Sequence, residues 1–146
     1  MSKGNTFEND LLKLIFTNTD IADIGDAGGL QNSATEGSLY IALHTADPGE
    51  AGNATTSEAA YTNYARVAVA RNATYWTVSS NTVTNASQIT FPQCGASGAT
   101  ITHVSITTAS SGTSKILYSG ALTSSLSVSL NITPLFAASG LTITED

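Results

Sequence analysis

The stretch that decides the fold is "SLYIALHTADPGEAG", residues 38–52. Its first seven residues alternate, so that Leu39, Ile41 and Leu43 lie on one face of an extended chain. A period of two predicts a β-strand, and the Asp-Pro-Gly sequence that follows is typical of a turn. The stretch also contains one histidine and two acids, so these residues could have either a catalytic role or a purely structural one.

The same period of two continues along most of the remaining chain. Short alternating segments, separated by turn residues about every eight to twelve positions, are typical of a β-sandwich or barrel. We expect a mainly β protein, an antiparallel, jelly-roll-like β-sandwich of about eight or nine short strands. The clearest segment is "LSVSLNI", whose Leu126, Val128, Leu130 and Ile132 are expected to face inward. The other expected strands are "SLYIALH" (38–44), "YARVAVAR" (64–71), "TYWTV" (74–78), "NTVTN" (81–85), "QITFP" (88–92), "ATITHVSITT" (99–108), "KILYSGAL" (115–122) and "GLTITED" (140–146).

One segment, "NTFENDLLKLIFTNT" at residues 5–19, has helical spacing instead. Its apolar residues recur three and four positions apart, which predicts one helix with a stripe to bury. Asn5 or Thr6 is expected to cap this helix, and Glu8 suits the positive end of the helix dipole. The chain is therefore expected to divide into an N-terminal helix-and-loop arm, residues 1–36, and a β-sandwich domain, residues 37–146. The predicted stripe is Phe7, Leu11, Leu14 and Ile15, widened by Leu12 and Phe16.

The composition excludes several classes of function. Charged residues make up 11% of the 146 residues, against about 25% in an ordinary domain, and more than a quarter of the residues are Ser or Thr. Residues 59–144 hold Arg66, Arg71, Lys115 and no acid, so a basic stripe for nucleic acid is missing. No run of 18 apolar residues predicts a membrane span, and the acids near the N-terminus argue against a signal peptide. The single Cys94 predicts no internal disulfide and is expected to be a packed residue of a protein made in a reducing cytoplasm.

The search for a catalytic or metal site gives little. His44 and His103 are the only histidines, each lies on a predicted strand, and a structural role is expected for both. Zinc needs three or four ligands with close pairs, and no such His or Cys pair is present. A G-x-S-x-G nucleophile motif is also missing. We therefore expect no enzyme activity, no cofactor and no metal site.

The acidic residues are also expected to have structural roles. Asp20, Asp23 and Asp26 recur at every third position, which does not match the alternate oxygen ligands of a helix–loop–helix calcium site. Capping and solubility are the favoured explanation, with a weak cation site as the alternative. Asp47 and Glu50 flank Pro48-Gly49, where a turn is favoured over an acid–base pair.

Protein contacts are the remaining candidate for function. Tyr61, Tyr64 and Tyr75 lie close in sequence to two arginines, and tyrosines suit the partly buried rim of an interface. Trp76 is expected to anchor the core, with an exposed sugar-stacking platform as the alternative. The interface candidates are Tyr61, Tyr64, Arg66, Arg71, Asp47, Glu50, Phe7 and Leu11.

At "LYIALHTADPGEAG" (39–52) and "SEAAYTNYARVAVAR" (57–71) the sequence resembles a family of small virion proteins of tailed bacteriophages, often called phage tail fibre proteins. The pattern continues through "WTVSSNTVTNASQITFPQC" (76–94), "ITHVSI" (101–106), "KILYSGAL" and "LTITED", and so covers nearly the whole chain. The resemblance implies a structural role in the phage particle and no catalytic residues.

Two placements in the virion stay open at this point. A compact domain without a shaft-forming repeat is also similar to capsid decoration or cement proteins, which sit on the outer shell as trimers. We favour decoration, with the major capsid protein and sister subunits as partners and no nucleic acid or membrane. The alternative is a tail fibre or tail-tip component that contacts tail proteins and binds a host receptor or glycan.

Overall fold

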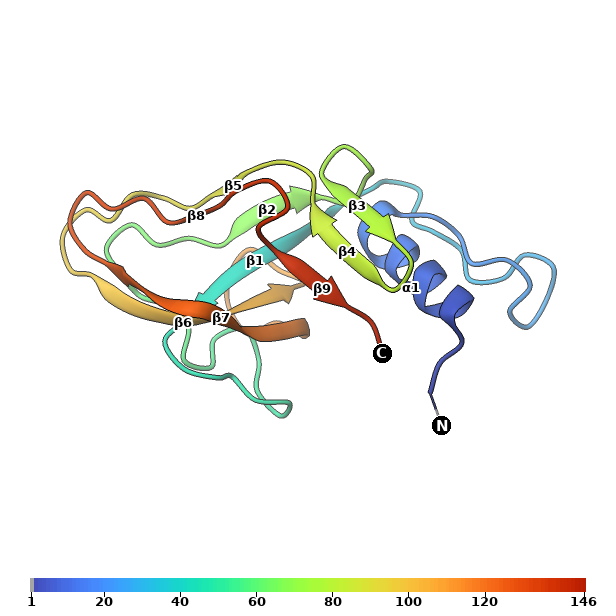
Figure 1. Cartoon of the computed structure of the whole chain (residues 1–146), viewed down its shortest axis with the longest axis horizontal. Helices are drawn as coiled ribbons and strands as arrows, with labels where there is room; N and C mark the ends of the chain where they lie inside the picture. Colours follow the sequence, from blue (N-terminus) through green and yellow to red (C-terminus); the bar gives the residue numbers. More distant parts are fainter. Residues whose placement is uncertain (1) are drawn as a thin grey trace. The chain divides into compact units, whose positions relative to one another are not determined.

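The computed structural model describes residues 2–146, which form one helix and nine strands (Figure 1). The strands are antiparallel where they pair, in a four-stranded sheet of order β2-β1-β6-β7, a three-stranded sheet β3-β4-β9 and a two-stranded sheet β5-β8. The predicted class is confirmed: the protein is mainly β, sandwich-like and not a closed barrel. The elements are α1 (Asn5–Thr17), β1 (Ser38–His44), β2 (Val67–Ala70), β3 (Trp76–Ser79), β4 (Thr82–Asn85), β5 (Ile89–Thr90), β6 (Ala99–Thr107), β7 (Ile116–Val128), β8 (Leu135–Phe136) and β9 (Thr142–Thr144).

The chain packs as two compact units. Unit 1 comprises Met1–Ser38, Ala70–Gln88 and Phe136–Asp146, and unit 2 comprises Leu39–Val69 and Ile89–Leu135. Helix α1 thus belongs to a unit that also holds β3, β4 and β9. The division at residues 36 and 37 expected from the sequence stays a prediction, since these units describe packing and not independent folding.

In unit 1, α1 packs on the β3–β4 hairpin through one face. The expected cap at Asn5 or Thr6 is wrong, because both residues already lie within the helix: Gly4 is the N-cap and no side chain caps it. Leu12 and Phe16 are fully buried, while Phe7 is exposed, so the stripe is rotated relative to the predicted one. Phe16 meets Trp76 edge to face, with ring centroids 4.8 Å apart.

In unit 1 the chain turns at residues 80–81, between β3 and β4, within the hairpin turn that the sequence predicts at Ser79–Asn81. Trp76 pairs with Asn85 across β3 and β4, and Trp76 is only 1% exposed, as expected for a core anchor. Asn85 is also fully buried, and its side chain holds three backbone groups. Its Nδ2 donates to the carbonyls of Ser87 and Ala137, and its Oδ1 accepts from the amide of Leu141. This amide therefore ties the C-terminal segment to β4.

Unit 2 is built around β1 and β6, which pair from Tyr40↔Thr107 to His44↔His103. Both faces of the second half of β1 are buried, because Ala42 and His44 are as hidden as their alternating neighbours. The alternation of apolar residues thus predicts the position of β1 correctly. The C-terminal half of the strand, however, has no face exposed to solvent.

One prediction for unit 2 is wrong. The segments 115–122 and 126–132 were expected to be separate strands, but β7 runs without a break from Ile116 to Val128. Its pairing with β6 is irregular, since Ile101 faces Leu126 while His103 faces Ala121, so that four β7 residues face one β6 residue. Of the apolar residues expected to face inward in 126–132, Val128 alone is buried. Leu126, Leu130 and Ile132 are exposed, and the last two lie beyond the end of β7 at Val128.

Candidate interaction surface

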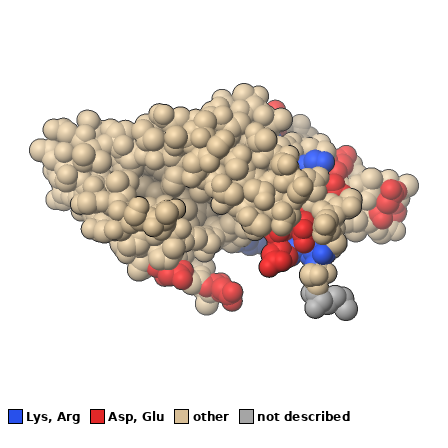
Figure 2. Space-filling view, in the orientation of Figure 1, with Lys and Arg blue, Asp and Glu red and all other residues tan. Residues whose placement is uncertain are grey.

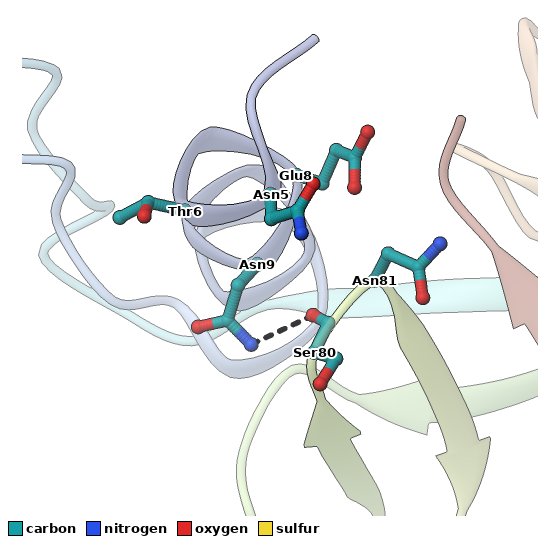
Figure 3. A pocket seen from close by; sticks show the side chains of 6 residues that line it. All are labelled: Asn5, Thr6, Glu8, Asn9, Ser80 and Asn81. Atoms are coloured by element: carbon teal, nitrogen blue, oxygen red, sulfur yellow. Dashed lines mark hydrogen bonds between the residues drawn. The ribbon is translucent and has the colours of Figure 1, made fainter.

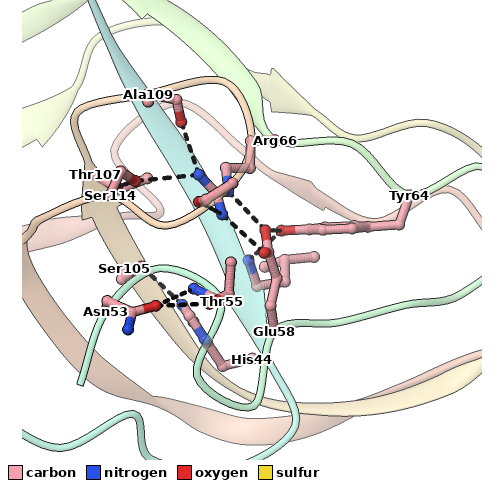
Figure 4. A network of polar contacts seen from close by, with 12 residues as sticks. His44, Asn53, Thr55, Glu58, Tyr64, Arg66, Ser105, Thr107, Ala109 and Ser114 are labelled. Atoms are coloured by element: carbon pink, nitrogen blue, oxygen red, sulfur yellow. Dashed lines mark hydrogen bonds and ion pairs between the residues drawn. The ribbon is translucent and has the colours of Figure 1, made fainter.

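The strongest polar arrangement in unit 2 surrounds Arg66 (Figure 4). Its Nε donates to Glu58 Oε1 at 2.7 Å and its Nη2 to Glu58 Oε2 at 2.8 Å. Nη1 and Nη2 also donate to the carbonyls of Ala109 and Gly112 in the turn between β6 and β7. The paired carboxylate raises the pKa of Arg66. The guanidinium therefore joins the segment before β2 to the β6–β7 turn, and its donors are used inside the protein.

Two tyrosines near Arg66 in the sequence also form internal hydrogen bonds in unit 2. Tyr64 donates its hydroxyl proton to Glu58 Oε1 at 3.1 Å and accepts from the amide of Leu43 at 3.0 Å. Burial raises the pKa of Tyr64. Tyr61 donates to the carbonyl of Pro92, and burial raises its pKa to about 12. Both hydroxyls are thus neutral internal donors over the physiological pH range.

His44 lies at the end of β1 and is fully buried. Its Nδ1 lies 2.9 Å from the carbonyl of Thr56, which can only accept, so Nδ1 carries the proton. Nε2 then accepts from Ser105 Oγ at 2.7 Å. Burial lowers the pKa of His44, partly opposed by the bond to Thr56 and the charge of Glu58. A serine and a neutral histidine at this distance resemble a nucleophile and its base, but Ser105 is itself 1% exposed and substrate cannot reach it.

Three of the acidic residues, Asp20, Asp26 and Asp47, accept hydrogen bonds from backbone amides. Asp47 Oδ1 accepts from the amide of Gly49, and Asp26 Oδ1 accepts from the amides of Gly28 and Gly29. Asp20 Oδ1 accepts from the amide of Asn32. Residues 2–146 contain no group of three or more His, Cys, Asp or Glu side chains placed to hold a metal ion.

The structure separates the predicted interface residues into two classes. Tyr61 and Arg66 are buried, and the hydrogen bonds above explain why: their polar groups hold unit 2 together. Arg71 is half-buried and donates to the carbonyls of Leu14 and Ile15, near the end of α1. The candidates that remain on the surface are Phe7, Asp47 and Glu50, with Leu11 and Tyr64 half-buried.

A polar pocket of about 490 Å³ lies in unit 1, between the start of α1 and the β3–β4 turn (Figure 3). Asn9 Nδ2 donates to the carbonyl of Ser80 across it. Glu8 reaches the pocket from the buried face of the helix and is 6% exposed. The pocket is also lined by Asn5, Thr6 and Asn81. This lining has no aromatic ring on which a sugar could stack.

The surface residues that sequence reasoning missed are apolar. Within ten residues of unit 2, Leu126, Leu130, Ile132 and Leu135 are 36%, 56%, 40% and 47% exposed. We call residues 126–135 the apolar segment. It lies inside the acid-free stretch 59–144, and Figure 2 shows large continuous areas without charged atoms. In the sequence, the lack of charge around the apolar segment could have indicated an apolar surface. Strand alternation alone does not distinguish the exposed face from the buried one.

A comparison with known families decides the relationship. A family model described as podophage GP4 fiber I protein gp80 matches residues 2–144. The chain belongs to this family of phage fibre proteins. No curated protein matches the sequence. Because it belongs to this family, the chain is a structural protein of the virion. This agrees with the resemblance seen in the sequence. In residues 2–146 of this family member, no helix has the length and hydropathy to cross a membrane.

Proposed function

We propose that the chain is a structural component of the phage tail fibre apparatus and acts through protein–protein contacts. The observation that carries the proposal is the family match over residues 2–144 to a fiber I protein. The partners are other copies of the chain and tail proteins, without nucleic acid, membrane or cofactor. This differs from the placement favoured from the sequence, which was decoration of the capsid.

The side-chain chemistry supports an assembly role. Groups that could react, such as Ser105 beside His44, are buried and used as internal hydrogen-bond partners. The exposed large side chains of the apolar segment are aliphatic, which suits desolvation on contact with another protein. Catalysis would need an accessible cleft around these groups, so we propose that the chain is not an enzyme.

Two narrower alternatives have different support. Capsid decoration is favoured by the short chain without a shaft-forming repeat and by the low charge. Glycan binding through a stacking platform loses its main support, because Trp76 is packed against Phe16. Decoration is therefore the second candidate.

Stoichiometry in purified virions tests the proposal. Antibody or mass-spectrometric quantification against the major capsid protein gives the copy number of the chain per particle. A fibre component is expected at a small fraction of the capsid protein. A copy number near that of the capsid protein would contradict the fibre proposal and support decoration.

A further inference from the structure

The polar pocket in unit 1 contains a buried acid that the proposed function does not use. Glu8 lines the pocket, is 6% exposed and is the one buried acid among residues 2–146. Over the same residues, neither a hydrogen bond nor an ion pair reaches its carboxylate. The one fully enclosed side-chain nitrogen or oxygen without a partner in this range is Trp76 Nε1, so the Glu8 oxygens stay open to the pocket. The fold thus holds an unpaired carboxylate at the wall of a cavity.

The cations of unit 1 are used or placed elsewhere. Lys3 Nζ lies 3.1 Å from Glu145 Oε1, and Arg71 donates to backbone carbonyls near the end of α1. Lys13 follows Glu8 by five positions, which puts the two side chains on different faces of the helix. Within the described chain Glu8 therefore has no cation to pair with, so a cation at this place would come from a ligand.

The charge at the pocket favours a cation over an anion. The free N–H groups in the first turn of a helix often bind anions. Here Glu8 already places a negative charge in that turn, and the helix dipole is equivalent to only about half an elementary charge. Burying a carboxylate is unfavourable unless a cation or hydrogen bonds compensate for the lost water. A cationic ligand would supply both.

The other groups around the pocket are neutral and polar. They are three asparagine amides and two hydroxyls, from Asn5, Asn9, Asn81, Thr6 and Ser80. In the view of Figure 3, Asn5, Glu8 and Asn81 extend on the same side of α1 and Thr6 on the other. Asn81 Nδ2 already donates to the carbonyl of Glu145 at 3.0 Å, so this amide offers a ligand acceptor capacity at Oδ1.

We propose that this pocket binds a primary ammonium group, which donates to the Glu8 carboxylate and to the amide oxygens of Asn5 and Asn81. An ammonium group is compact and has three donors that point in different directions, which suits acceptors from a helix and from a turn. A guanidinium has its donors in one plane and suits a paired carboxylate better. Calcium affinity rises with the number of charged ligands, and this lining has a single carboxylate.

The pocket has room for the chain that carries the ammonium group, since its volume is about 490 Å³. Two sources share this chemistry, a lysine side chain of another protein of the particle and a free diamine. We favour the lysine, and this choice of source rests on the proposed function, in which the chain acts through protein contacts. Recognition of the ammonium group itself does not depend on that function.

Titration of the ¹⁵N-labelled chain, followed by NMR, tests the proposal. The probes are Nα-acetyl-lysine N-methylamide and putrescine, both with a primary ammonium group. Saturable shifts are expected at Asn5, Glu8 and Asn81, with a dissociation constant for the lysine amide of about 1 mM. The same amide acetylated at Nε has lost its charge and is expected to give no saturable shift up to about 20 mM.

Two variants assign the binding to the pocket. Glu8→Gln keeps the shape of the side chain and removes its charge, and it is expected to raise the dissociation constant roughly tenfold or more. Asn5→Ala, at an exposed position, is expected to weaken binding several-fold and does not disturb a buried group. The matched control is Asp10→Asn, the same loss of charge on the same helix but outside the pocket lining, with less than about a twofold effect expected. The spectra also show whether each variant is folded.

Several results would overturn the inference. They are the absence of saturable shifts, equal binding of the Nε-acetylated amide, unchanged binding in both Glu8→Gln and Asn5→Ala, an equal effect of Asp10→Asn, and tighter binding of Ca²⁺ or of the matching arginine amide at the same residues. Tighter binding of the lysine amide than of putrescine would support a protein lysine as the source, and the reverse would overturn that source in favour of a free diamine. Failure here is distinguishable from failure of the proposed function, since the copy number in virions does not depend on this pocket.

Discussion

The guanidinium of Arg66 and the carboxylate of Glu58 form two parallel hydrogen bonds, 2.7 Å from Nε to Oε1 and 2.8 Å from Nη2 to Oε2. The residues are eight positions apart, and Tyr61 and Tyr64 lie between them in the sequence. Since Arg66 also holds the β6–β7 turn, this pair connects two loops of unit 2 through one buried group.

Removing the guanidinium should destabilise the protein strongly. Arg66→Met leaves the Glu58 carboxylate with the Tyr64 hydroxyl but without its cation, and it removes the donors to the carbonyls of Ala109 and Gly112. Breaking a buried pair from one side lowers the free energy of unfolding by about 3 kcal/mol. Urea denaturation measures this, with Lys115→Met, an exposed cation, as the control expected to change stability by less than about 0.5 kcal/mol. Equal stability of the two variants would show that the pair does not hold the loops.

Asn85 should be equally sensitive, for a different reason. Asn85→Ala leaves the amide of Leu141 and the carbonyls of Ser87 and Ala137 without their side-chain partner. The amide of Leu141 is the buried one of these groups, and leaving a buried group unsatisfied costs about 1–3 kcal/mol, so a loss of about 2 kcal/mol is expected in thermal or urea unfolding. Hydrogen exchange should also speed up at Leu141. A variant as stable as wild type would mean that water replaces all three bonds.

Stability should fall in mild acid because of His44. Burial lowers the pKa of His44 in the folded protein below its ordinary value of 6.5, while the unfolded chain keeps that value. Above pH 6.5 the imidazole is neutral in both states and this stability is fully present. As the pH falls below 6.5 the unfolded state takes up the proton first, so the free energy of unfolding decreases by up to about 1.4 kcal/mol per pH unit.

Urea titrations between pH 7.0 and about 5.5 measure this slope, before the carboxylates titrate. His44→Gln is expected to be less stable at neutral pH but to lose most of the slope. A slope that is the same in His44→Gln and wild type would show that other groups cause the acid sensitivity.

Trp76 gives a spectroscopic test of the core. It is the only tryptophan in the chain and is 1% exposed beside Phe16. Its emission should be blue-shifted and weakly quenched by acrylamide, and host saccharides should leave it unchanged. Strong quenching, or a saturable change on adding a sugar, would return the stacking platform to consideration.

The sequence predicts the β class, the hairpin around residues 80–81 and the structural roles of Asp47 and His44, because these follow from local spacing and turn chemistry. It does not predict the exposure of Leu130 and Ile132. Alternation shows that the two faces of a strand differ in polarity. Whether the apolar face is buried depends on whether another layer of the protein covers it. The Glu58–Arg66 pair was also missed. Its signal was present, since Glu58 is the last acid before the acid-free stretch and Arg66 is the first cation inside it.

Tyr61 and Arg66 show a second limit of pattern reasoning. Their residue types are typical of interfaces, and the sequence analysis proposed them for that reason. The same properties, a long side chain with an apolar body and a polar end, also suit internal connections between loops. Which role applies is decided by loops far apart in sequence, such as residues 109–112 around Arg66.

The placement of the chain in the phage particle tests the central claim most directly. Cryo-electron microscopy of intact virions, with the fold of residues 2–146 fitted to the density, locates every ordered copy. The account predicts density for this β-rich chain on the fibres at the tail, in a small number of copies. Copies spread across the icosahedral shell, with none at the tail, would contradict it.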